Sequence, residues 1–320
     1  MRRTGYIWKR SVFAVVTIFA AVSFNFVLFR VLPGSAITRI SRVPNASPSM
    51  KKALAEQFGL DKSMWDQYWL YLKNLFTGNW GISYSNRQPV IENLAVAFGN
   101  TLPVVSIGTI VAIILGILVG VHSAVRRGTF ADHFSTNLAV LFYAFPTQFL
   151  GMMLLIFFAG VLPAAGTHDP FAFNQTPWES FLDYSKHMIL PVLTLVLTLY
   201  AENALIVRSS MLETLGEDYI LTARAKGLSR RKIIRDYAMR NALLPIVTMV
   251  ALALGAIVSG AILIEVIFSW PGIGRALYDA VLQRDYPMLQ GGFLIITVVV
   301  VLLNYLADLA YYKLDPRVVD

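Results

Sequence analysis

The chain has 320 residues, of which 56% are hydrophobic and 14% are charged, and its formal net charge is +8. Soluble domains contain about 45–50% apolar residues, so this composition points away from a soluble globular protein and towards a membrane protein. The sequence has no cysteine, which excludes disulfide bonds, thiol catalysis and cysteine-based metal sites.

Six long apolar stretches follow one another along the chain, and each is close to the roughly 20 residues that a helix needs to cross a bilayer. None has Lys or Arg in its middle, where either residue costs roughly 2.5–3.5 kcal/mol on insertion scales. The stretches are 11–32, 101–122, 134–162, 187–207, 242–266 and 291–312. The first is too long for the core of a cleaved signal peptide. We therefore predict an all-α polytopic membrane protein with about six transmembrane helices.

Basic residues are distributed unevenly between the short loops, which predicts the orientation of the chain. Sixteen Lys and Arg lie at the two ends of the chain and in the loops 123–133 and 208–241, whereas the other short loops hold three. We therefore expect a multi-pass protein of the cell (inner) membrane with both termini in the cytoplasm. The expected segments are a cytoplasmic N-terminus (1–10), a first transmembrane helix (11–32), an extracellular segment (33–100), a transmembrane domain with a cytoplasmic loop at 208–241 (101–312) and a cytoplasmic C-terminus (313–320).

The extracellular segment alternates apolar and polar residues with helical period over 47–76. Gly59 is placed to end a first helix, and Asp61 is placed to cap a second one. Gly78, Gly81 and Pro89 then predict irregular chain. We expect a helical segment outside the membrane, followed by a loop that leads into the second span.

Three of the spans contain residues with special properties. Gly116 and Gly120 have the spacing that lets two helices approach closely, which favours ordinary packing. Pro146 lies midway along the third span and should bend it, so that the neighbouring Gln148 could border a pathway, although a plain packing kink is an equal alternative. Glu202 and Asn203 lie one turn inside the cytoplasmic end of the fourth span; they are pathway candidates because polar groups within membranes are costly, but Glu202 could also reach the interface.

The loop at 208–241 contains a basic stretch, DYILTARAKGLSRRK, in residues 218–232. Asp218 favours a helix start, the alanines favour helix, and Gly227 favours its end. Ser229 can cap a second helix that runs towards Leu243. The small side chains would let a partner's backbone come close. The plain alternative is an interfacial helix pair whose charge only marks the cytoplasmic side.

The sequence FSWPGIGRALYDAV, at 268–281, follows the fifth span on the outer face. Its proline and glycines predict a tight turn, and Trp270 is expected to anchor at the membrane interface. Glu265, at the outer end of the span, could pair with Arg275 or line an opening. A purely structural turn is an equal alternative for any one of these residues.

Several common chemistries leave no trace in the sequence. There is no G-x-x-x-x-G-K-[ST] phosphate loop, so ATP hydrolysis by that route is not expected. The G-x-S-x-G elbow and the H-E-x-x-H pair are also missing, and the four histidines lie near the ends of different elements. We expect no catalytic residue, no metal site and no nucleic-acid partner.

The stretch DYILTARAKGLSRRKIIRDYAMRNALLP resembles the cytoplasmic loop of binding-protein-dependent ABC importer permeases, in the form found in the oligopeptide and dipeptide branch. The resemblance covers nearly the whole chain. EQFGLDKSMWDQYWLYLKNLFTGNWGISY is similar to the family's outer segment, IEVIFSWPGIGRALYDAVLQRDYPMLQG to its last outer loop and NYLADLAYYKLDPRVVD to its C-terminus. Together these stretches indicate the B-type subunit. Two places depart from the family pattern: Leu221 and Thr222 replace the Glu and Ala of the generic loop, and 33–36 lack the usual acidic residue.

The resemblance implies a type I ABC importer permease fold in which the short cytoplasmic helix is a coupling helix. The residues that it assigns to coupling with an ATPase are Asp218, Tyr219, Thr222, Ala223, Arg224, Ala225, Lys226 and Gly227. The residues that it places near an outer gate or a binding-protein dock are Glu265, Trp270, Pro271, Gly272, Gly274 and Arg275.

The implied function is that of a permease subunit which forms half of the pathway of an ATP-driven importer for di- and oligopeptides. The implied partners are a second homologous permease, two ATPase subunits that bind ATP and Mg, an extracellular substrate-binding protein and the lipid bilayer. The chain itself is expected to bind no cofactor. The same machinery could carry oligosaccharides or nickel. An ATP-independent secondary transporter is a weaker alternative, because inverted repeats and charges at mid-membrane are not visible.

Overall fold

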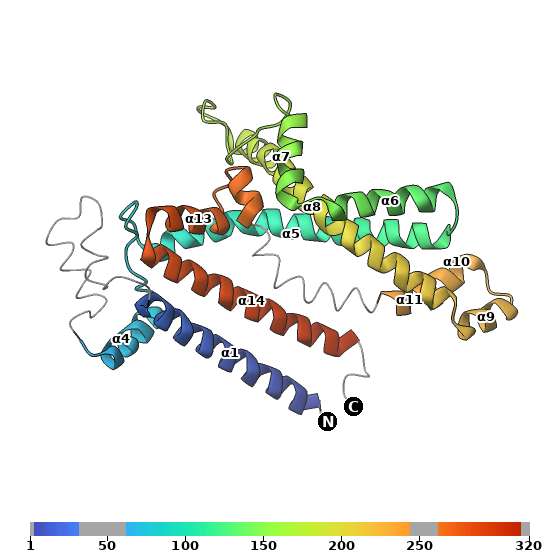
Figure 1. Ribbon diagram of the computed structural model, residues 1–320, viewed down its shortest axis with the longest axis horizontal. Helices are drawn as coiled ribbons and strands as arrows, with labels where there is room; N and C mark the ends of the chain where they lie inside the picture. Colours follow the sequence, from blue (N-terminus) through green and yellow to red (C-terminus); the bar gives the residue numbers. More distant parts are fainter. Residues whose placement is uncertain (1–2, 32–61, 244–261, 315–320) are drawn as a thin grey trace.

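The computed structural model describes residues 3–31, 62–243 and 262–314, most of which are helical (Figure 1). The elements are α1 (Arg3–Val31), α4 (Met64–Phe76), α5 (Val90–Val125), α6 (Phe130–Ala144), α7 (Thr147–Phe157), α8 (Pro177–Leu215), α9 (Asp218–Ala225), α10 (Arg230–Lys232), the π-helical turn η1 (Ile233–Ala238), α11 (Met239–Ala242), α13 (Ile273–Gln283) and α14 (Tyr286–Leu314). In the described ranges, strand-like pairing is confined to one isolated bridge between Ile82 and Pro89. The predicted all-α class is confirmed. Most of the expected fifth span and the expected helix before Gly59 lie outside the described residues.

Four described helices are long and apolar enough to cross a membrane. They are Gly5–Arg30 within α1, Val90–Val125, Pro177–Leu215 and Tyr286–Leu309 within α14. The surface of α5 shows why, since Ile110, Ile114 and Leu118 are 57%, 51% and 61% exposed. A helix of a soluble protein would place polar residues there, so these side chains face lipid or another apolar partner. The helix also extends beyond the predicted boundary at residue 100, because its first eleven residues fall in the expected extracellular segment.

The helices α5 and α8 form the central pair of the fold, and they pack through glycines on α5. A Cβ atom added at any of three glycines would overlap a side chain of α8, so the two backbones are unusually close. The facing pairs are Gly108 with Leu195, Gly116 with Asn203 and Gly120 with Val207. Positions on both helices increase together, which means that α5 and α8 run parallel. The packing interpretation of the Gly116 and Gly120 spacing is confirmed.

The third predicted span is divided into α6 and α7, which meet at an angle of 105°. Phe145 and Pro146 are extended, with ψ angles of 131° and 134°. Proline disfavours helical geometry at the residue before it, and this explains the break. The expectation of one bent helix over 134–162 was therefore wrong in degree: Pro146 separates two helices of 15 and 11 residues, each shorter than a single span.

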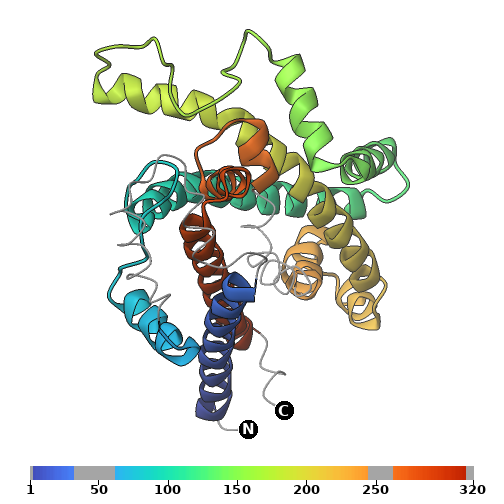
Figure 2. The same cartoon turned by 60° about the vertical axis from the view of Figure 1, so that its left-hand side comes forward.

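The two termini of the described chain lie at the same end of the molecule. Figures 1 and 2 show α1 and α14 side by side and antiparallel. Arg10 forms an ion pair with Asp308 at 3.1 Å, and Ser11 is hydrogen-bonded to Tyr305 at 2.7 Å. This arrangement agrees with the prediction that both termini are on one side of the membrane.

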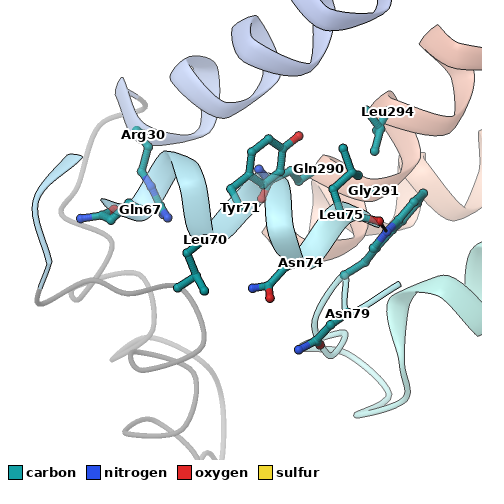
Figure 3. Close-up of a pocket in the computed structure, with 11 residues that line it drawn as sticks. Arg30, Gln67, Leu70, Tyr71, Asn74, Leu75, Asn79, Gln290, Gly291 and Leu294 are labelled. Carbon is teal, nitrogen blue, oxygen red and sulfur yellow. Dashed lines mark hydrogen bonds between the residues drawn. The ribbon is translucent and has the colours of Figure 1, made fainter. Parts of the chain in front are cut away.

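At the opposite end, α1 and α14 meet α4 around a small pocket of about 40 Å³ (Figure 3). Tyr71 of α4 and Gln290 of α14 line it, and the amide of Asn25 donates to the Gln290 carbonyl at 3.0 Å. The N-cap of α4 is Ser63, whose hydroxyl accepts from the backbone of Asp66. The helix thus begins two residues beyond the predicted Asp61 cap.

Candidate functional site

The short helix α9 lies directly after α8, at the end of the molecule that also holds both termini (Figure 1). It ends as the sequence predicts, because Gly227 has a φ of +73° and its backbone N–H donates to the Arg224 carbonyl at 2.9 Å. This left-handed conformation favours glycine. The predicted helix and its glycine stop are confirmed, whereas its predicted contact with an ATPase stays a prediction.

The inner face of α9 is buried in a hydrophobic core of the chain. Ile220 is fully buried and Ala223 is 3% exposed. The other buried members of this cluster, which we call the α9 cluster, are Ala124, Val207, Met211, Ile233, Ala238 and Ala242. The expectation that Ala223 offers a small surface to a partner was therefore wrong, because its methyl group is buried in a cluster that also holds residues of α5, α8 and η1. Alanine is needed here for packing within the chain.

The outer face of α9 is free within the part of the chain that the structure describes. Asp218, Leu221, Thr222 and Ala225 are all exposed, and their spacing places them opposite Ile220 and Ala223. The Leu221 side chain is 56% exposed, although it lies outside the predicted spans.

The flanks of α9 carry the remaining predicted coupling residues. Arg224 and Lys226 are exposed. The hydroxyl of Tyr219 accepts a hydrogen bond from the Asn241 amide at 2.8 Å, which joins α9 to α11. The eight predicted coupling residues thus form an exposed face, two basic side chains beside it, the Tyr219 hydrogen bond to α11, the buried Ala223 and the glycine that ends the helix.

A buried ion pair joins α6 to α8 just above this region. The Arg208 Nε and Nη2 atoms donate to the two carboxylate oxygens of Asp132 at 2.7 and 3.0 Å. Ser123 of α5 and the backbone N–H of Gly128 also donate to this carboxylate. The Asp132 side chain is 1% exposed and that of Arg208 is 25% exposed. A two-pronged pair with further donors satisfies a buried carboxylate well, so it fixes the α5–α6 loop to α8.

A second cluster, which we call the outer clasp, lies at the opposite end of α5. Its centre is the carboxylate of Glu265, which is 1% exposed. The Thr101 hydroxyl donates to Glu265 Oε1 at 2.6 Å, and the backbone N–H groups of Gly274 and Arg275 donate to Oε2 at 2.7 and 3.1 Å. The carboxylate therefore lies at the N-terminus of α13, where helix N–H groups favour negative charge.

The clasp corrects two expectations for this loop. Glu265 binds the backbone of Arg275 and does not line an opening, while the Arg275 side chain pairs with Asp279 at 3.6 Å. Trp270 is fully buried and its indole N–H donates to the Asn100 carbonyl at 2.9 Å, so it does not anchor at the lipid interface through an exposed ring.

The two glycines of the outer loop are required by close packing. A Cβ atom on Gly272 would overlap the Glu265 carboxylate, and one on Gly274 would overlap Ile262. Pro271 contributes its carbonyl, which accepts from the Asn100 amide at 3.0 Å. The predicted tight turn is confirmed, and it is fastened to α5.

The pathway candidates do not come together as one polar cluster. Gln148 and Pro146 are exposed at the break between α6 and α7. Asn203 donates to the Leu199 carbonyl at 2.9 Å and packs against Gly116. Glu202 is half-buried, and no hydrogen bond within the described ranges joins it to the other three. Their role in a pathway stays a prediction.

Comparison with known proteins identifies the family. Residues 112–320 match the family described as binding-protein-dependent transport system inner membrane component, and residues 3–107 match its N-terminal model. The chain belongs to this family. This permease is 38% identical over 332 residues to the dipeptide transport system permease protein DppB of Escherichia coli (strain K12), with 98% of both chains covered.

Two further relatives cover the same length. The permease is 35% identical over 330 residues to the di/tripeptide transport system permease protein DppB of Pseudomonas aeruginosa (strain UCBPP-PA14). It is 34% identical over 317 residues to the glutathione transport system permease protein GsiC of Escherichia coli (strain K12). Each comparison covers 98% of both chains. The resemblance seen in the sequence is therefore confirmed, and so are the multi-pass membrane character and the permease fold class.

Sequence reasoning missed the residues that support the two clusters in this permease. Thr101 and Asn100 belong to the clasp, and Asp132 and Arg208 form the buried pair. Thr101 is separated from Glu265 by 164 positions, and Asp132 from Arg208 by 76. Such partners leave no local pattern. The one available signal was Thr129 three residues before Asp132, which marks a helix start and not an ion pair.

Proposed function

We propose that this permease forms half of the translocation pathway of an ATP-driven importer for di- and oligopeptides. It works with a second homologous permease, two ATPase subunits that bind ATP and Mg, and an extracellular substrate-binding protein. The chain binds no cofactor of its own and hydrolyses no ATP. It lies in the cell membrane with both termini in the cytoplasm, and the segment before α5 faces outward.

The observation that carries this proposal is the two-sided construction of α9. Its inner face is embedded in a core shared with α5, α8 and η1, while its outer face presents Leu221 and neighbouring exposed side chains. A partner that grips the outer face would move the cytoplasmic ends of two long helices, since the buried residues of α9 share one core cluster with residues of both. ATP that binds preferentially to the closed pair of ATPases would thereby favour one conformation of the permease.

The outer clasp supports a matching role at the other end. Glu265 and Thr101 connect α5 to α13, so a rotation of α5 is transmitted to the outer loop. In our proposal this loop lies at the gate through which the binding protein delivers substrate. The two ends of α5 thus connect the ATPase side to the substrate side.

The substrate class follows from the relatives, whose names specify dipeptides, di- and tripeptides and glutathione. All three are short peptides, which favours peptides over oligosaccharides or nickel. A family defined by dependence on a binding protein also argues against a secondary transporter that acts alone.

A substitution on the outer face of α9 tests the coupling role. We expect Leu221→Glu to reach the membrane and to retain the second permease, because the side chain is exposed and no packing within the chain is lost. We expect it to lose the ATPase subunits on co-purification and to reduce ATP-dependent dipeptide uptake about tenfold or more, since an apolar contact of this size contributes about 1.5–3 kcal/mol when buried.

Two controls separate coupling from folding. Ala223→Glu places a charge in the α9 cluster and should fail to accumulate. Leu282→Glu changes a leucine of similar exposure, 65%, on α13 at the other end of the molecule, and should keep its ATPases. Full ATPase binding and normal uptake by Leu221→Glu would refute the assignment of α9.

A further inference from the structure

A groove of about 600 Å³ opens beside α9, between the ends of α5 and α8 and the turn that leads to α10. Three arginines line it, namely Arg127, Arg224 and Arg230. Its remaining wall is apolar and includes Leu212, Leu215 and Leu228. No Asp or Glu side chain is among its described lining residues.

The basic side chains of the groove are available to a ligand. Arg127 and Arg224 make no ion pair with any residue that the structure describes. Arg230 is positioned by a hydrogen bond from its Nη2 atom to the Val125 carbonyl at 2.7 Å, which leaves its other donors free. Glu213 and Glu217 are close in sequence but do not line the groove.

The ends of three helices explain part of this charge. The last residues of α5, α8 and α9 all lie near the groove, and cations are favourable near helix C-termini. The effect of the helix C-termini does not explain the apolar wall or the cavity, because cations are favourable there without either. A groove with a basic rim and an apolar wall is typical of a binding site for a ligand that carries both an anionic group and hydrocarbon.

The depth of the groove agrees with such a ligand. Val125 is the last residue of α5, three residues beyond the expected end of its apolar stretch. Leu212 lies five residues beyond the expected end of the fourth span, which corresponds to about 8 Å along a helix. The groove therefore begins where the hydrocarbon layer ends and extends through the layer of lipid headgroups.

We propose that this groove binds the phosphate group of an anionic phospholipid from the cytoplasmic leaflet. The arginines hold the phosphate, and the apolar wall contacts the glycerol backbone and the first carbons of the acyl chains. Basic pockets between membrane helices on the cytoplasmic side bind anionic headgroups in this way. The inference rests on the proposed orientation of the permease. A lipid bound here would hold the base of α9 to the bilayer surface.

The test uses the complete transporter in nanodiscs made of phosphatidylcholine with 10–20% phosphatidylglycerol, a composition of about one anionic lipid in five to ten that mimics a weakly charged surface. Retained phosphatidylglycerol is counted by native mass spectrometry after transfer to detergent. The variants are Arg127→Gln with Arg230→Gln, and Arg127→Lys with Arg230→Lys. Arg231→Gln is the matched control, because Arg231 is an exposed neighbour on α10 that does not line the groove.

We expect the double Gln variant to bind phosphatidylglycerol about 30-fold more weakly, because each basic residue near a membrane surface contributes roughly a factor of five. The double Lys variant and Arg231→Gln should retain it. Inorganic phosphate is added at 10-fold excess over the lipid. It should displace phosphatidylglycerol only if the phosphate group alone is sufficient for binding. A lack of displacement would show that the apolar wall contributes to binding. Both results support the site.

Equal retention of phosphatidylglycerol by the double Gln variant would overturn the proposal. So would loss of the ATPase subunits by that variant with unchanged lipid retention, since the groove would then be a protein interface. Dipeptide uptake is measured in parallel. If the unmodified transporter carries no peptide while the variants show the expected difference in lipid retention, the proposed function is refuted and the lipid site is supported.

Discussion

Several residues in this permease contact partners that are far away in the sequence, and Glu265 is the clearest case. A buried carboxylate is costly unless its oxygens are paired. Here one hydroxyl and two backbone N–H groups donate hydrogen bonds to the carboxylate. Gly272 has no side chain, which leaves room for this carboxylate. The negative charge at the start of α13, the glycine and Thr101 of α5 therefore form one unit.

The substitution Gly272→Ala tests this unit. The added methyl group would overlap the Glu265 carboxylate, so the carboxylate has to move away from its donors. Overpacking of this kind typically costs about 1–3 kcal/mol. We expect a lower midpoint of thermal unfolding in detergent, measured by intrinsic fluorescence.

The matched control for that substitution is Gly99→Ala. Gly99 also lies near the outer end of α5, but a Cβ atom there has no neighbour within 4 Å. Alanine stabilises a helix interior by up to about 1 kcal/mol relative to glycine, so this variant should unfold at the same or a higher temperature. A Gly272→Ala variant as stable as Gly99→Ala would show that the clasp is loose.

The residue scale also shows where sequence reasoning stops. The helix start at Asp218 and the left-handed Gly227 were predictable, because capping and glycine geometry are local. The burial of Ala223 and Trp270 was not, since it depends on helices that arrive from other parts of the chain. A small residue in a basic loop and a tryptophan beside a membrane each have two physical explanations, and only the packing chooses between them.

At the scale of elements, the ion pair of Asp132 and Arg208 fixes together the ends of α5, α6 and α8 that lie near α9. The pair lies one or two turns from the point where α8 ends and α9 begins. With Ser123 and Gly128 it connects the α5–α6 loop to the helix that leads into α9. The α9 cluster then continues the same connection into α9 itself.

Removal of one charge should therefore destabilise the permease strongly. The substitution Asp132→Asn leaves Arg208 largely buried without its counter-charge, and loss of one partner of a buried pair costs about 3–5 kcal/mol. We expect the lower part of this range, since Arg208 is partly exposed. The measurement is the midpoint of thermal unfolding of the purified protein.

Two further variants make this prediction specific. Asp132→Asn combined with Arg208→Gln removes both charges and should recover part of the loss, because no lone charge remains. Asp236→Asn breaks the pair with Arg235, whose side chain is 78% exposed, and should leave the midpoint unchanged, since exposed pairs are screened by water. Equal stability of Asp132→Asn and Asp236→Asn would contradict the structural role of the buried pair.

The helices α6 and α7 show the same limit of prediction for an element. Apolar composition predicted a continuous span across 134–162, and Pro146 predicted a bend within it. Composition cannot distinguish a bent helix from two helices, because both bury the same residues. The outcome depends on whether neighbouring elements compensate for the missing backbone hydrogen bonds at the proline.

At the scale of the whole molecule, the parallel arrangement of α5 and α8 determines how the chain between them must run. The glycine contacts place the end of α5 and the end of α8 at one side of the molecule. The segment from residue 126 to residue 176 must therefore return to the opposite side before α8 begins. Because α6 and α7 form the helical part of this segment, we expect the bent pair to serve as a membrane crossing.

The orientation of the whole molecule follows as the last prediction. The positive-inside rule places α9 in the cytoplasm and the loop before α5 outside. Because the natural sequence contains no cysteine, a single introduced cysteine is the sole target for a membrane-impermeant maleimide. Ser85→Cys lies in the exposed loop before α5, and Ser229→Cys lies at the exposed start of α10. Intact cells should label only the first variant, and inverted membrane vesicles should label only the second.

Detergent-permeabilised cells provide the control, since both variants should then react and the unmodified permease should not. The length of α5 makes the test decisive. Its 36 residues span about 54 Å, more than the ~30 Å hydrocarbon layer, so its two ends cannot share one side of the membrane. Labelling of Ser229→Cys in intact cells would show that the orientation is the reverse of the predicted one. It would remove α9 from the compartment that holds ATP, and the coupling role of α9 would have to be abandoned.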